Sequence, residues 1–195
     1  MPKLVRNFRH LTIPLGYNKT KSLNSQSVAN SGTKLLIVGT ITPPGAGYFY
    51  CSKYNRIFGY LDERFGTDLK SKKLEVADPG TREKGIDDIK RILRDKNIAF
   101  LDVMKEAIRK NKSPSDKDIL YYTLDYGSFE KKIGEGTIII VNSRLAEEGF
   151  VNIAQSLKLE NKAEYVPQRG GTKKLWVQTL EEAYFRGALI PGRQI

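Results

Sequence analysis

The stretch that decides the fold of this 195-residue chain is KLLIVG, residues 34–39, in which four apolar residues follow one another and a glycine ends the run. Apolar side chains on both faces are typical of a strand inside a parallel sheet, because helices cover such a sheet on both sides. Two later runs have the same character, IAFLDV at residues 98–103 and TIIIV at residues 137–141. The three runs predict three buried strands.

Helical patterns lie between and after these runs. GIDDIKRILRDK (residues 85–96) precedes the second run and places its isoleucines and a leucine on one face. LAEEGFVNIAQSL (145–157) follows the third run, and LWVQTLEEAYFRGAL (175–189) predicts a last helix closed by Gly187 or Pro191. Strands alternating with helices predict an α/β fold: a three-layer α/β/α sandwich with a mostly parallel central sheet.

The predicted domain organisation is simple. Residues 34–195 form a single α/β domain, since nothing in this stretch reads as a linker or a repeat. Residues 1–33 are predicted to be a basic N-terminal arm and loop, because residues 18–33 are polar and lack a hydrophobic period.

The charge of the chain is strongly positive and unevenly placed. Lys and Arg number 33 against 22 Asp and Glu, which gives a net charge of +11 and a pI near 9.6. Eight of the basic residues precede the first acidic residue, Asp62. Excess positive charge predicts a polyanionic partner, with nucleic acid ahead of an anionic membrane.

Several classes of protein do not fit this sequence. Cys51 and His10 are the single cysteine and the single histidine, so zinc-ligand spacing is absent and a Ser-His-Asp or Cys-His set would depend on His10 in the basic arm. There is no phosphate-binding G-x-x-x-x-G-K-[ST] motif. No apolar run approaches the length of a membrane span. We therefore expect an intracellular, cytoplasmic protein with no metal, no cofactor and no membrane partner.

The densest functional motif is GTITPPGAGYFYCSKYNRIF, residues 39–58. It begins where a buried strand ends, and in parallel sheets function collects in such loops. A stiff glycine- and proline-rich turn, aromatic faces, an amide and a guanidinium suit the binding of a planar heterocycle beside a phosphate. The alternative for any single aromatic residue is that it fills the core beneath the loop.

The order of these motifs resembles the uracil-DNA glycosylase superfamily, most nearly its mismatch-type and hypoxanthine-DNA glycosylase branches. The resemblance covers roughly residues 34–150. It implies DNA repair by base excision: a hydrolase that binds duplex or single-stranded DNA as a monomer, flips a deaminated base into an aromatic pocket and hydrolyses the N-glycosidic bond. The residues that carry it are 36–40 with Pro43 and Pro44, 48–50, 55–58, 98–103 with 113–119, and 138–142.

The resemblance also implies roles for individual residues. Thr42, or Ile41 if the extra residue is placed differently, stands where most branches have the Asp or Asn that orients water. Asn55 matches an Asn of the hypoxanthine-type branch, so Thr42 and Asn55 are the catalytic candidates. Tyr48, Phe49 or Tyr50 would stack the base. Asn142 would read the base edge or, alternatively, form a cap or turn. Asp102 would position a ligand or cap the next helix.

The loop VPQRGGTKK (166–174) takes the place of the superfamily's His-x-Ser-Pro or Ser-x-Ser-Pro loop. Gly170 and Gly171, with Arg169, Lys173 and also Arg56, are predicted to bind DNA phosphates, and Gln168 or Arg169 to act as the wedge. The alternative is a solvated basic turn. Because the water-orienting Asp/Asn and the His are replaced, a non-catalytic nucleic-acid or nucleotide binding module on the same fold stays open.

Overall fold

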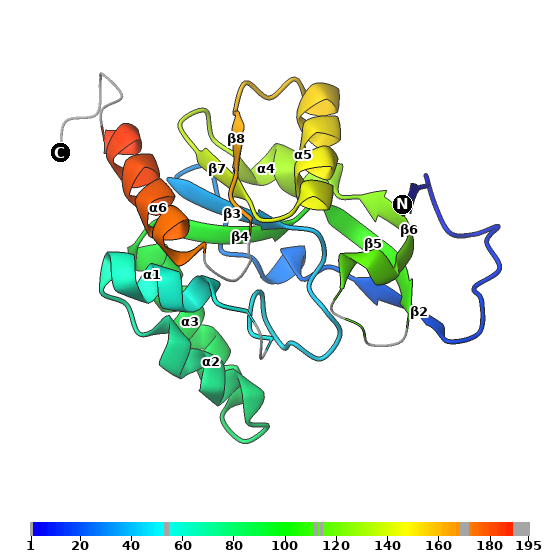
Figure 1. Cartoon of the computed structure of the whole chain (residues 1–195), viewed down its shortest axis with the longest axis horizontal. Coiled ribbons are helices and arrows are strands. Elements are labelled where there is room, and N and C mark those ends of the chain that lie inside the picture. Colours follow the sequence, from blue (N-terminus) through cyan, green and yellow to red (C-terminus); the bar gives the residue numbers. More distant parts are fainter. Residues whose placement is uncertain (1, 53–54, 111–112, 114, 168–171, 189–195) are drawn as a thin grey trace.

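The structure, a computed structural model, describes residues 2–52, 55–110, 113, 115–167 and 172–188. Its central sheet contains four parallel strands in the order β4 (Ile98–Asp102), β3 (Leu35–Gly39), β7 (Ile138–Val141) and β8 (Ala163–Tyr165). The three apolar runs are thus neighbours, with β3 between the other two (Figure 1). Their prediction as buried parallel strands is confirmed.

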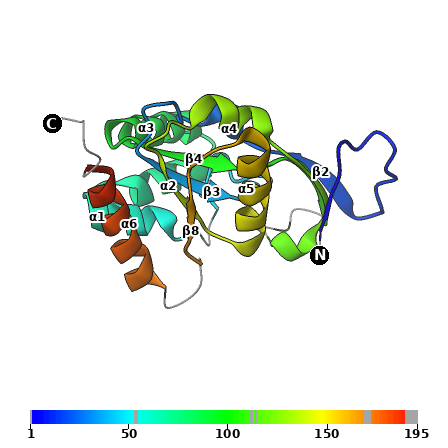
Figure 2. The ribbon, with the colours of Figure 1, turned by 90° about the horizontal axis from the view of Figure 1, so that it is seen from above.

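Alternation along β3 divides the core into two layers. Leu35 and Ile37 pack with α1 (Ile57–Phe65), α2 (Leu69–Ala77), α3 (Arg82–Asp95) and α6 (Lys173–Ala188). Leu36 and Val38 pack with α4 (Tyr126–Lys132) and α5 (Arg144–Leu157). Helices therefore cover both faces of the sheet (Figures 1 and 2), and the predicted α/β/α sandwich is confirmed.

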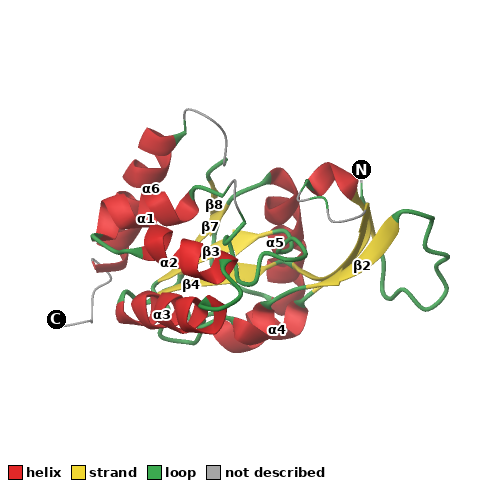
Figure 3. Ribbon diagram, turned by 90° about the horizontal axis from the view of Figure 1, so that it is seen from below, coloured by secondary structure: helices red, strands yellow, loops and turns green. Residues whose placement is uncertain are grey.

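A second sheet lies beside the first (Figure 3). Its order is β1 (Lys3–Leu4), β6 (Ile119–Leu124), β5 (Met104–Lys110) and β2 (Tyr17–Lys21), with β5 antiparallel to both of its neighbours. The prediction of a loop over residues 18–33 is wrong at β2. This edge strand buries only Thr20, so it carries no apolar alternation that its sequence could reveal.

The three predicted helices are confirmed, with one correction to the end of the last helix. Residues 85–96 and 145–157 correspond to α3 and α5, and the last helix is α6. Gly187 does not close α6, which continues to Ala188, and Pro191 lies outside the described residues. Helices α1 and α2 were not predicted, because residues 57 and 58 were interpreted only as part of the motif and no secondary structure was assigned to residues 59–77.

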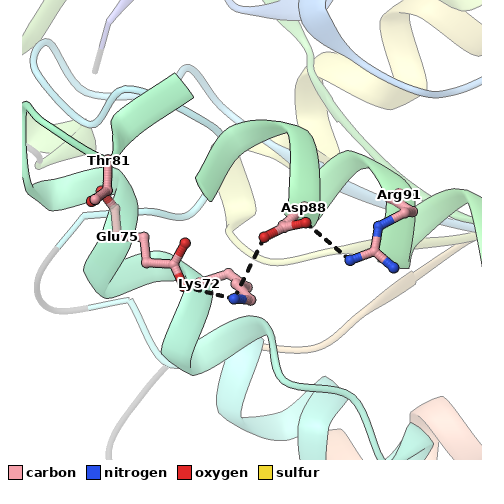
Figure 4. Close-up of polar contacts among 5 residues, drawn as sticks. All are labelled: Lys72, Glu75, Thr81, Asp88 and Arg91. Carbon is pink, nitrogen blue, oxygen red and sulfur yellow. Dashed lines mark hydrogen bonds and ion pairs between the residues drawn. The ribbon is translucent and has the colours of Figure 1, made fainter. Parts of the chain in front are cut away.

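Helices α2 and α3 form a tightly bound hairpin (Figure 4). Lys72 Nζ lies 2.6 Å from the Glu75 carboxylate and 3.5 Å from that of Asp88, which also accepts a hydrogen bond from Arg91. A Cβ at Gly85 would lie 2.9 Å from the Val76 nitrogen, so only glycine permits this close crossing. The hairpin also carries Lys73, whose Nζ donates to the Asn55 carbonyl at 2.7 Å. It thus anchors the end of the motif loop.

Candidate functional site

The candidate site lies at the carboxyl edge of the central sheet, where β3, β4 and β7 end at Gly39, Asp102 and Val141. Backbone hydrogen bonds continue past the strand ends. The Asn142 N–H donates to the Val38 carbonyl at 3.2 Å, and the Val103 N–H donates to the Gly39 carbonyl at 2.9 Å. Asp102 and Asn142 are therefore held on either side of the β3 terminus.

Thr42 and Asp102 form the innermost pair of the site. The backbone N–H and the hydroxyl of Thr42 both donate to Asp102 Oδ2, at 2.8 and 2.9 Å. Both residues are buried, with 7% and 3% of their surface exposed. Burial raises the pKa of Asp102 to about 6, against the lowering effect of the Thr42 hydrogen bonds. No helix follows Asp102, because the chain continues into β5, so its interpretation as a helix cap is wrong.

Asn24 fixes the backbone at Asp102. This residue belongs to a short 3-10 helix, η1 (Asn24–Gln26), and is almost completely buried. Its Oδ1 accepts from the Asp102 N–H and its Nδ2 donates to the Asp102 carbonyl, each at 2.8 Å. Nδ2 also donates to Asp125 Oδ2 at 2.8 Å. The amide thus pairs with the outer edge of β4 as a neighbouring strand would.

Tyr50 and Asn142 form the second pair. Asn142 Nδ2 donates to the Tyr50 hydroxyl oxygen at 3.1 Å, and the Tyr50 ring lies edge-on to Phe100 with centroids 4.8 Å apart. A Cβ at Gly39 would lie 2.9 Å from that hydroxyl, so glycine is required there. Burial, and then the charge of Asp102, raise the pKa of Tyr50, which keeps the hydroxyl protonated at neutral pH.

The other aromatic candidates do not join this cluster. Tyr48 and Phe49 are fully buried in the core on the α1–α3 side and contact each other edge to face, with centroids 5.2 Å apart. The motif thus combines two core residues with one ring at the strand ends. Tyr50 reaches the strand ends by adopting a left-handed backbone with φ of +56°, a conformation that a non-glycine residue adopts only where its surroundings hold it.

Asn55 and Arg56 lie at the start of α1. Asn55 Oδ1 accepts from the Ile57 N–H at 2.9 Å, closing a turn before the helix. Arg56 is exposed. Hydrogen bonds join Asn55 to the start of α1 and to Lys73, and its catalytic role stays a prediction.

A groove adjoins Asn142. It has a volume of about 780 Å³, within the range of small-molecule pockets. One wall is the β7–α5 junction with Asn142 and Arg144, and the other includes η2 (Asp116–Asp118). Asp116 Oδ1 accepts from the Thr40 hydroxyl at 2.6 Å, which ties this wall to the loop after β3. The guanidinium of Arg144 lies 4.0 Å from the centre of the Tyr165 ring.

The fold has a counterpart among solved protein structures. No family model matches the chain, and no curated protein sequence matches it. A solution NMR structure from Methanosarcina acetivorans, named "putative Uracil DNA glycosylase", is similar with a TM-score of 0.53 and 16% sequence identity, over 80% of this chain and 94% of that chain. This fold is uracil-DNA-glycosylase-like. At this identity the likeness concerns the fold alone.

Within this glycosylase-like fold, Arg109 is a site residue that the sequence analysis missed. It lies on β5, is fully buried, and its Nη2 donates to the Ser115 carbonyl at 3.4 Å. Its Nε and Nη1 have no hydrogen-bond partner among the residues that the structure describes. Burial lowers its pKa, opposed by the charges of Asp116 and Asp102. The strand that carries Arg109 was not predicted, so its surroundings in the sequence gave no signal.

The predicted phosphate-binding loop is only partly described. Gln168, Arg169, Gly170 and Gly171 lie outside the described residues. Lys173 begins α6, and its Nζ lies 2.7 Å from the Glu63 carboxylate of α1. The structure therefore joins Lys173 to the α1 side.

The described ranges lack two kinds of feature. They contain no group of three or more His, Cys, Asp or Glu residues that could hold a metal ion. None of their helices has the length and apolar character that a membrane crossing requires.

Proposed function

We propose that this protein is a DNA glycosylase that binds DNA, turns a deaminated base out of the helix and hydrolyses its N-glycosidic bond. One observation carries the proposal: the Thr42–Asp102 and Tyr50–Asn142 pairs lie at the carboxyl edge of a uracil-DNA-glycosylase-like sheet, where Asn142 also lines a groove. The net charge of +11 supports a DNA partner, because phosphate contacts dominate protein–DNA affinity.

In this proposal Asn142 reads the base edge. Its Nδ2 donates to Tyr50, which directs the carboxamide oxygen away from Tyr50 as an acceptor. Uracil, hypoxanthine and xanthine present a ring N–H beside a carbonyl, whereas cytosine and adenine present an unprotonated nitrogen at that position. An acceptor on Asn142 therefore favours uracil over cytosine and hypoxanthine over adenine, the bases from which they arise by deamination. Tyr50, rather than the buried Tyr48 or Phe49, would contact the base.

Basic residues around the groove would bind the DNA backbone. Lys117 and Arg144 line the groove, and both are exposed. Arg56 is exposed at the start of α1. With Lys173, and with Arg169, Gly170 and Gly171 as predicted from the sequence, these groups would hold the DNA phosphates, and Gln168 or Arg169 would act as the wedge. Asn55 would help to orient the attacking water.

The test is base release. Duplex and single-stranded oligonucleotides carrying uracil, hypoxanthine, xanthine or an alkylated base are incubated with excess protein, and abasic sites are detected by alkaline strand cleavage. We expect cleavage at a deaminated base. Retained DNA binding without any abasic product would contradict the proposal and favour the non-catalytic binding module.

A pair of asparagine variants tests the reading of the base. Asn142→Ala removes the base-reading amide, and Asn152→Ala removes an exposed amide on α5 that donates to the Glu148 carbonyl of the same helix. We expect Asn142→Ala to slow base release by about 100-fold or more, since buried hydrogen bonds carry most of such discrimination. Asn152→Ala should release the base at the wild-type rate.

A further inference from the structure

We propose that Asp102 accepts the proton of the attacking water through the hydroxyl of Thr42, so that these two residues together replace the single Asp or Asn of other branches. The inference rests on the proposed glycosylase function. In this arrangement Thr42 is the residue that contacts the water, and Asp102 acts behind it.

The direction of the Thr42 hydroxyl supports this relay. Its single proton points to Asp102 Oδ2, 2.9 Å away, and the same carboxylate oxygen accepts the Thr42 N–H at 2.8 Å. A hydroxyl that donates its proton keeps two lone pairs as acceptors. A water molecule bound to Thr42 must therefore donate to it, which leaves a lone pair of the water free to attack.

The carboxylate is held rigidly for this task. Asn24 bonds both the N–H and the carbonyl of Asp102, and Thr42 closes on Oδ2. Asp102 Oδ1 lies on the Gly39 side, 3.3 Å from where a Cβ of that residue would be. Both members of the pair are nearly dry, and in a water-excluded site such charge interactions are stronger than in solution.

The charged and titratable groups around Asp102 suit a base at neutral pH. Tyr50 on the loop after β3 and Arg109 on β5 interact with its charge. Asp116 of η2 interacts with Tyr50 and Arg109, and Asp125 is linked to Asp102 through Asn24. Burial raises the pKa of Asp102 to about 6, and Arg109 acts in the opposite direction. A base whose pKa lies near the working pH is both ionised and able to take a proton.

The proposed step is balanced. The water oxygen forms a bond to C1′ of the sugar while the C1′–N bond breaks and its electron pair goes to the base nitrogen. The water proton passes to Thr42 Oγ1 as the Thr42 proton passes to Asp102 Oδ2. Asp102 then releases that proton to solvent and the departing base takes one up. One water molecule is consumed.

The experiment measures single-turnover base release by Thr42→Val, Thr42→Ser, Asp102→Asn and the Thr42→Val/Asp102→Asn double variant. We expect Thr42→Val and Asp102→Asn each to slow release by about 100-fold, the usual scale for a lost proton transfer. The double variant should be no slower than the slower single variant, because residues of one relay act as a unit. Thr42→Ser should keep most of the rate.

Two controls separate chemistry from folding. Thr123→Val makes the same change at a buried threonine of β6 and should leave the rate unchanged, and each variant should bind the duplex with the wild-type Kd. The wild-type rate should fall below about pH 6 as Asp102 becomes protonated, and this fall should be absent in Asp102→Asn.

The outcomes distinguish the two proposals. Wild-type base release with an unaffected Thr42→Val variant, or with losses that multiply in the double variant, would overturn the relay and leave the glycosylase function standing. No base release by the wild type from any oligonucleotide would contradict the glycosylase function, and the relay with it.

Discussion

The two sheets of this protein differ in how they are built and in what they contribute to the site. The central sheet is parallel, and β3, β4 and β7 are apolar on nearly every residue. The second sheet mixes buried and exposed positions, and its edge strand β2 is mostly polar. In the central sheet, β4 ends at Asp102 and β7 is followed by Asn142. The second sheet contributes Arg109 on β5 and leads into η2. The central sheet can thus be recognised from its sequence, whereas the second sheet, which completes the site, has only a weak sequence pattern.

The junction between the two regions should be the most sensitive place. Asn24→Ala leaves the buried N–H and carbonyl of Asp102 without their partner, and buried polar groups cost about 1–3 kcal/mol each when unpaired. We expect the free energy of unfolding to fall by about 3 kcal/mol in urea denaturation. Asn30→Ala, at an exposed position of the same segment, is the control. Equal losses in the two variants would show that η1 does not support β4.

The central sheet should reveal a conflict between stability and function at Asp102. The pKa of this buried acid is raised to about 6 in the folded protein, so folding takes up a proton and the wild type loses stability as pH rises from about 4 to 7. Asp102→Asn carries no such charge. It should be more stable than the wild type at pH 7 by roughly 2 kcal/mol and about equally stable at pH 4. Denaturation at both pH values checks this, and a pH-independent difference would contradict it.

The second sheet should gain stability when a buried hydroxyl is removed from it. Thr123 of β6 is buried, and its hydroxyl has no hydrogen-bond partner in the described part of the chain. Valine has the same shape without the hydroxyl and is favoured in strands. Thr123→Val should therefore raise the free energy of unfolding by about 1 kcal/mol. A loss of stability would mean that the hydroxyl is satisfied after all.

The smallest effect tests whether Arg109 of the second sheet changes the pKa of Asp102 in the central sheet. The positive charge of Arg109 favours the ionised form of Asp102, so Arg109→Met should raise the pKa of Asp102. The fall in base release at acid pH should then begin at a higher pH than in the wild type. Arg91→Met removes an exposed charge from α3 and should leave the profile in place. A profile that moves in neither variant would separate Arg109 from the site.

Site residues near the predicted strands of the central sheet could be proposed from the sequence, whereas the others could not. Tyr50, Asp102 and Asn142 could be proposed because each follows or adjoins a recognisable strand. The choice of Tyr50 over Tyr48 and Phe49 could not, since it depends on a left-handed backbone at one residue. Asn24 was missed because its partner Asp102 lies 78 positions further along the chain, and Arg109 because its own strand, β5, was not predicted.

The sequence by itself determined the central layer of this protein: three runs that can be buried only in a covered parallel sheet, and the polar residues that must follow them. The tertiary structure alone decided which of those residues meet. Hydrogen bonds such as Thr42 to Asp102 and Tyr50 to Asn142 join residues 60 and 92 positions apart. Local patterns of hydrophobicity carry no information about such distances, because the bonds exist only once the strands have been placed side by side.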